Sequence, residues 1–395
     1  MATTTAPNGL EALNNLVTST LDLITRLETV VANITAENQR STPTAPTTTS
    51  PEDQQPTNPH PEINPLLLAS DSSTLLRAHA TKLSLLIINE PFTPSAICSI
   101  LKQLTSGPLP GLASAAQICV SSTWTATISQ DLGYRISRIL RETKALVEKI
   151  PSDGKALKDA GAKGGRGSIA NTGTLWAACD EVVAFAKRGF GGNVVKRTEE
   201  LRDTVKDVME ELKEWGEETG SDDEDEDDED EDENDDEEDE DVKGVTQSLE
   251  ATKIADTQAM LDDLMNSSSY IPRDDPDKIR ERLESCLRRL RLVTLLYQAV
   301  AKRRFKSLPQ TAPAECSDIP KRLDEILVLL KKIPERFGSL ALAFYELDPV
   351  EIDKLMDQCF FDCFAVAELL IKSWDGEKDE FSDWVVKFQA EIKKA

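Results

Sequence analysis

Cys359 and Cys363 stand one helical turn apart, and their spacing could hold a metal ion. Structural zinc needs four ligands, and neither a histidine nor a second cysteine pair lies near these two residues. Both fall on an apolar stripe beside Phe360 and Phe364, where a thiol behaves as a small apolar side chain. We therefore predict core thiols, no bound metal and no cofactor.

The histidines and glycines give little support for catalysis. His79 follows Leu76 by three positions and precedes Leu83 by four, a spacing typical of a packed or edge histidine. His60 lies in a Pro-rich stretch, far from any plausible nucleophile. The segment 161–167, GAKGGRG, lacks the spacing of a phosphate-binding loop and indicates a flexible basic linker. We predict no catalytic residues and no enzyme activity. An enzyme of unrecognised type would need a polar pocket that holds His79 and neighbouring carboxylates.

Basic residues gather in one expected helix, 277–306. The triplet Lys302–Arg304 ends this helix, where cations are favourable, and a nuclear-import signal is the weaker alternative. Arg288, Arg289 and Arg291 make one side of the helix basic, but the leucine spacing is too short for a DNA-binding zipper. We predict a basic solvated face that could dock an acidic partner.

The strongest charge feature is an acidic run from Asp222 to Asp241, with 19 Asp/Glu in 20 positions and only Asn234 between them. Such a block cannot bury apolar surface and repels itself in a compact state, so it predicts disorder. The formal net charge is -26, and removing these 19 charges leaves -7. Ser221 precedes the run, and its acidic downstream context resembles the sites of acidophilic casein kinases. Ser221 is therefore the candidate phosphosite.

The elements that must position these residues are expected to be helices. Apolar residues recur at steps of three and four along most of the chain, and no convincing apolar alternation is present. We predict an all-α fold with two helical bundles separated by a disordered acidic run, each half folding around its own core. Helices distant in sequence are free to exchange between the bundles. The expected parts are an N-terminal amphipathic helix (1–38), a Pro/Thr-rich linker (39–62), an N-terminal helical bundle (63–218), an acidic disordered linker (219–244) and a C-terminal helical bundle (245–395).

The expected helices are set by apolar spacing and by Pro and Gly breaks. They cover residues 10–34, 66–88, 94–104, 112–120, 124–150, 172–187, 193–215, 245–265, 277–306, 321–333, 352–371 and 381–388.

Several classes of protein are disfavoured by composition. The N-terminus has no basic region followed by an apolar region, and no apolar stretch approaches the roughly 18 residues that span a bilayer. We expect a soluble intracellular chain whose seven cysteines are reduced. Its negative charge argues against direct nucleic-acid binding, which relies on Lys and Arg contacts to phosphate.

Three segments carry a family resemblance. They are LLRAHATKLSLLIINEPFTPSAICSIL (75–101), GTLWAACDEV (173–182) with its continuation to Trp215, and RLVTLLYQAVAKRR (291–304). In this order they resemble the cyclin-D-interacting protein family, also called cyclin-D-binding protein-like. The resemblance implies an all-helical, non-enzymatic protein of the nucleus and cytoplasm that restrains cell-cycle progression through protein partners.

The functional hypothesis is a protein-interaction factor of this type, with cyclin-like or other cell-cycle partners and with residues 222–241 as an electrostatic arm. The alternative is an acidic chaperone or binder of histones or other basic proteins, which would use the same residues to shield positive charge.

Overall fold

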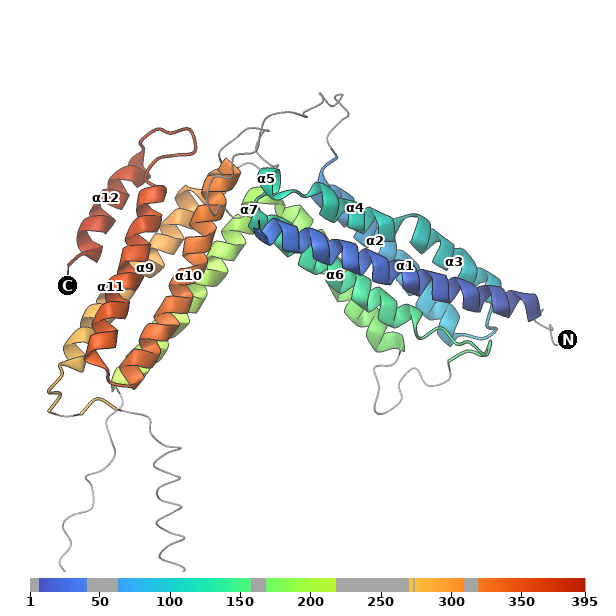
Figure 1. The fold of residues 1–395 in the computed structure, drawn as a ribbon, viewed down its shortest axis with the longest axis horizontal. Coiled ribbons are helices and arrows are strands. Elements are labelled where there is room, and N and C mark those ends of the chain that lie inside the picture. The colour runs from blue at the N-terminus through green and yellow to red at the C-terminus, as the bar shows by residue number, and fades with distance from the viewer. Residues whose placement is uncertain are drawn as a thin grey trace, which may run out of the picture. The chain divides into compact units, whose positions relative to one another are not determined.

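The computed structural model describes residues 7–40, 63–157, 168–217, 270–272, 274–308 and 319–394. These residues form α-helices and one short 3-10 helix, with no β-strand among them, and so confirm the all-α prediction (Figure 1). Several predicted features lie outside the described residues: the acidic run, Ser221, His60, the segment 161–167 and the helix predicted at 245–265.

The helices follow the apolar spacing, with boundaries that local signals explain. In chain order they are α1 (Pro7–Arg40), α2 (Pro65–Ile88), α3 (Pro94–Ser106), α4 (Pro108–Ile118), α5 (Ser121–Trp124), α6 (Ala126–Val147), α7 (Ser168–Glu217), α9 (Ile279–Arg303), the 3-10 helix η1 (Phe305–Ser307), α10 (Ile319–Tyr345), α11 (Pro349–Leu369) and α12 (Glu380–Ile392).

Capping and glycine conformation explain two of these boundaries. Asn64 caps α2, because its side-chain oxygen accepts hydrogen bonds from the backbone N–H groups of Leu66 at 2.9 Å and Leu67 at 3.3 Å. The two helices predicted on either side of 189–192 are both present and share the label α7; they meet at Gly189, whose φ of 67° and ψ of -169° are not helical. Glycine reaches that conformation without the steric cost that other residues carry, so one helix ends there and the next begins directly after it.

The helix predicted at 321–333 is too short, because α10 continues through Pro334 to Tyr345. Proline lacks an N–H group and usually ends a helix, since it leaves the carbonyl four residues earlier without its donor. Here that carbonyl belongs to Leu330, and the Tyr297 hydroxyl donates a hydrogen bond to it at 2.6 Å. A replacement donor from another helix therefore removes one cost of continuing the helix.

The described helices divide into two compact units. Unit 1 comprises Met1–Glu200, Tyr297–Leu330 and Glu368–Val385, and within it α1 packs on α6 and α2 packs on α4 (Figure 1). Asp324 of α10 joins this unit by capping α6: its carboxylate accepts hydrogen bonds from the N–H groups of Ala126 at 2.7 Å and Thr127 at 3.3 Å.

Unit 2 comprises Leu201–Leu296, Lys331–Ala367 and Val386–Ala395. Its core contains the edge-to-face pair of Phe337 and Phe360, with ring centroids 5.5 Å apart, and the contact of Trp215 with Phe344 at 6.2 Å. These aromatic contacts hold parts of α7, α10 and α11 together.

The two units divide the chain differently from the predicted bundles 63–218 and 245–395. Both units draw on segments from either side of the acidic run, because Tyr297–Leu330 and Glu368–Val385 belong with the N-terminal helices. The exchange of helices left open by the sequence is therefore extensive. The sequence predicts that each half folds around its own core, whereas this sharing of helices predicts that neither half keeps its full helix content when separated.

Candidate interaction groove

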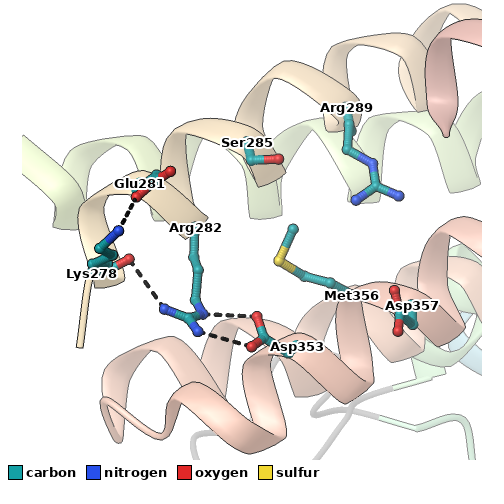
Figure 2. Close-up of a pocket in the computed structure, with 8 residues that line it drawn as sticks. All are labelled: Lys278, Glu281, Arg282, Ser285, Arg289, Asp353, Met356 and Asp357. Atoms are coloured by element: carbon teal, nitrogen blue, oxygen red, sulfur yellow. Dashed lines mark hydrogen bonds and ion pairs between the residues drawn. The ribbon is translucent and has the colours of Figure 1, made fainter. Parts of the chain in front are cut away.

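A groove of about 480 Å³ lies between α9 and α11 in unit 2. Figure 2 shows its side chains facing one another from the two helices. The lining residues are Lys278, Glu281, Arg282, Ser285, Arg289, Asp353, Met356 and Asp357.

Helical spacing places these residues on one side of α9. Glu281, Ser285 and Arg289 recur every four positions and so share a face. Leu283 and Leu290 lie on the side of the helix that is buried in the core. The same turns of α9 therefore fix the core and line the groove.

One end of the groove is held by an ion pair between the two helices. The Arg282 guanidinium donates hydrogen bonds from Nε and Nη2 to the Asp353 carboxylate at 2.7 and 2.9 Å (Figure 2). These bonds raise the pKa of Arg282 and lower the pKa of Asp353. Beside them, Lys278 Nζ lies 3.5 Å from Glu281, so charge is balanced at this end.

The other end of the groove carries Arg289. Its guanidinium carbon lies 3.7 Å from the centre of the Phe360 ring. Its Nε is buried and makes no hydrogen bond within the described part of the chain. Burial is the main cause that lowers the pKa of Arg289, and the carboxylate of Asp357 only partly opposes that shift. This cation is thus partly desolvated, and it forms no ion pair with any carboxylate among the residues that the structure describes.

The side chains that line the groove offer binding chemistry. Its hydroxyl belongs to Ser285, and no histidine is among the lining residues. His79 lies in α2, is 8% exposed, and has a pKa lowered first by burial and then by Lys82. A second cavity, of about 450 Å³ around Phe92 and Lys155, is also not lined by His79. The residues described do not bring His79 into either cavity.

The predicted core thiols are found in the core. Cys359 and Cys363 are both 0% exposed, as is Cys286 of the facing helix. Burial raises the pKa of Cys359 to about 12 and also raises the pKa of Cys363 and Cys286. No group of three or more potential metal ligands occurs among the described residues.

The basic triplet does not act as one unit. Lys302 and Arg303 are exposed, but Arg304 is 2% exposed. The Arg304 guanidinium donates to Asp379 and to the carbonyl oxygens of Leu370 and Ile371. Because the Arg304 side chain is buried and hydrogen-bonded inside unit 1, the folded chain does not expose all three basic residues of the possible nuclear-import signal.

The structure separates the three arginines of the predicted basic face. Arg288 and Arg291 are exposed, whereas Arg289 is half-buried in the groove. No sequence pattern indicates the Arg282–Asp353 and Arg304–Asp379 pairs, since each joins residues more than 70 positions apart. Only the arrangement of the helices brings these partners together.

Comparison with known proteins finds a family match in the N-terminal part of the chain. A family model described as "Grap2 and cyclin-D-interacting, N-terminal" matches residues 69–218. The resemblance to the cyclin-D-interacting family is confirmed over these residues. An uncharacterized protein of Schizosaccharomyces pombe is 22% identical over 283 residues, which cover 70% of this chain and 74% of the relative. Among the described helices, none is both long and apolar enough to span a bilayer.

Proposed function

We propose that this chain is a non-enzymatic protein-interaction factor that regulates cell-cycle progression through protein partners. The observation that carries the proposal is the match of residues 69–218 to the cyclin-D-interacting family model. The groove between α9 and α11 supports it, because its paired charges and its Met356 side chain suit the mixed surface of a protein partner.

The partner class that the family description suggests is a D-type cyclin, or another cell-cycle factor in its place. Such a protein would act in the nucleus and cytoplasm, and microscopy of the tagged chain tests that location. Phosphorylation of Ser221 stays a prediction, and phosphopeptide mapping from cells checks it.

The test is affinity purification of the tagged full chain from its native host, followed by mass spectrometry. We expect a cyclin or another cell-cycle regulator to be recovered and to bind again when both proteins are purified. Recovery of no cell-cycle protein in repeated experiments would contradict the proposal.

The second candidate function is binding of histones or other basic proteins. The observation that favours it is the acidic run, with 19 carboxylates in residues 222–241. Titration of core histones tests it. A complex that is lost both at high salt and when residues 222–241 are removed would favour this function over the first.

A further inference from the structure

We propose that three arginines of α9, the exposed Arg288 and Arg291 and the groove-edge Arg289, together form a docking surface for this chain's own acidic run, residues 222–241. The inference goes beyond the proposed function and does not depend on the identity of any partner.

The first step is the charge of α9. Residues 278–291 contain six cations and two carboxylates, a net charge of +4 in a chain whose overall charge is -26. The ion pairs of the groove engage Lys278 and Arg282 with described carboxylates. No such pair is formed by Arg288, Arg289 or Arg291 with any described carboxylate. Arg280 bonds to the carbonyl oxygens of Gly216 and Ile271, so the cations left for an incoming anion are these three arginines, with the exposed Glu284 one turn before Arg288.

The second step is the state of Arg289. Its guanidinium is held against the ring of Phe360, and its buried Nε has no hydrogen-bond partner within the described residues. Because Nε is enclosed by the chain, an incoming carboxylate can bond only to the outer nitrogens of this guanidinium, which the Phe360 ring holds in place. Arg288 lies beside it and uses one nitrogen on the carbonyl oxygen of Lys394, at 3.5 Å. A carboxylate that approaches this face meets oriented guanidinium groups.

The third step is the position of the tether. α7 ends at Glu217, and the carbonyl oxygen of Gly216 accepts a hydrogen bond from Arg280 of α9 at 3.5 Å. Chain that leaves α7 therefore starts beside the first turn of α9. From Arg280 to Arg289 the helix rises about 14 Å, and the five residues from Glu217 to Asp222 can extend to about 17 Å. The first carboxylates of the run can reach Arg289, and later ones can reach Arg291.

The fourth step is competition between occupants. A segment on so short a tether has a local concentration in the millimolar range. A separate acidic protein would need a comparable concentration, or a higher affinity, to displace the run from these arginines. Asp357 lies on the α11 side of the groove and repels an anion, so the run is expected to follow α9 and to contact the groove only at its Arg289 edge (Figure 2). An acidic segment of another protein would compete for the same arginines.

The test uses a dye-labelled peptide of residues 218–244 and two full-length chains. One is the wild type, and the other has every Asp and Glu of 222–241 replaced by Asn or Gln. The wild-type face is already occupied, so we expect the neutralised chain to bind the peptide at least about tenfold more tightly. Raising the salt from about 50 mM to about 500 mM should abolish that difference, because ions screen exposed charges. Equal affinity of the two chains at low salt would overturn the proposal.

Variants made in the neutralised chain locate the site. The triple variant Arg288→Gln/Arg289→Gln/Arg291→Gln should lose about tenfold or more in affinity, by loss of charge-assisted hydrogen bonds. The matched control Lys196→Gln/Lys206→Gln/Lys213→Gln removes three exposed cations of α7 and should change affinity little. If the control loses as much as the triple variant, binding is unspecific attraction between charges and the proposal fails.

Two further measurements distinguish docking within one chain from misfolding of the variant and from binding to a second copy of the chain. The double variant Arg288→Gln/Arg291→Gln changes only exposed residues and should leave the fold intact. It should still weaken peptide binding, so the proposal can be tested even if the triple variant does not fold. Light scattering reports whether the run binds a second copy of the chain. Self-association of the wild type that the triple variant abolishes would overturn docking within one chain.

Discussion

The Tyr297 hydroxyl donates a hydrogen bond of 2.6 Å to the carbonyl oxygen of Leu330. In a regular helix this carbonyl would accept from the N–H group of residue 334, but residue 334 is proline. Leu330 and Tyr297 are both 0% exposed, so water does not replace the missing donor at the Leu330 carbonyl. One side chain of α9 thus compensates for a helix-breaking residue in α10.

This relationship predicts a large cost for a small change. Tyr297→Phe should lower the free energy of unfolding by about 1–3 kcal/mol, because it leaves a buried carbonyl unsatisfied. Adding Pro334→Ala restores an N–H donor and should recover part of that loss. Tyr345→Phe is the matched control, because its hydroxyl bonds to Glu211 at the surface. Urea unfolding of the single and double variants measures the coupling, and strictly additive effects would contradict the compensation.

The buried Arg304 should carry a second large effect. Its Nη1 and Nη2 atoms donate to the Asp379 carboxylate at 2.6 and 2.9 Å. Removing one partner of a buried pair costs about 3–5 kcal/mol, and we expect about 3 kcal/mol for Asp379→Asn because Asp379 is partly exposed. Thermal unfolding measures it. Arg303→Gln is the control, since its pair with Glu380 is exposed and should contribute little.

The same pair predicts how stability depends on pH. The hydrogen bonds from Arg304 hold the pKa of Asp379 well below its usual range. A carboxyl group whose pKa is lowered by folding stabilises the protein above its unfolded pKa of about 4, and this contribution is lost as pH falls below that value. The melting temperature of the wild type should therefore fall between about pH 4 and pH 2 more steeply than that of Asp379→Asn. Parallel curves for the two proteins would refute the assignment.

The sequence predicts helix position and side-chain burial correctly where these depend on the residues of one helix alone. Apolar spacing located the helices, and the stripe around Phe360 correctly indicated buried thiols. It could not show that Pro334 lies inside a helix, because the donor that makes this acceptable comes from a different element. The burial of Arg304 was hidden for the same reason, since a cation near a helix end looks solvated until its distant partner is known.

The candidate groove was predictable only in part. The basic character of Arg288, Arg289 and Arg291 is plain in the sequence, and so is a possible acidic partner. That Arg289 alone faces the groove depends on the rotation of α9 against α11. The division of the chain into units was also hidden, because apolar spacing shows which face of a helix is buried and not which helix buries it.

The core position of Phe360 gives a prediction with a built-in control. Phe360 is 2% exposed and packs against Phe337, whereas the next residue, Phe361, is 68% exposed. Phe360→Ala should cost about 3–5 kcal/mol, because it leaves a cavity in a packed core. Phe361→Ala should change stability by less than about 0.5 kcal/mol, as surface substitutions usually do. Equal effects in chemical unfolding would place the two side chains in similar environments.

The described thiols should differ in reactivity. Five are buried: Cys119, Cys179, Cys286, Cys359 and Cys363. Burial raises the pKa of Cys119 and Cys179 to about 12, so little reactive thiolate forms near neutral pH. Cys98 is partly exposed and should be alkylated first. Iodoacetamide labelling with peptide mass spectrometry checks this order, which should vanish in denaturant, and elemental analysis should find no stoichiometric zinc.

The last prediction concerns the two halves of the chain. Unit 1 contains residues from both sides of the acidic run. Asp324 caps α6, and the backbone of Leu308 packs closely on Gly191: a Cβ atom added at Gly191 would lie 2.9 Å from the carbonyl oxygen of Leu308. Fragments 1–218 and 245–395 made separately should therefore lose helix relative to the intact chain, and mixing them should restore it. Full-length chain cut within 219–244 should elute as one complex. Circular dichroism and size-exclusion chromatography measure both outcomes. Fragments that each keep their full helix content alone would instead support the two bundles predicted from the sequence.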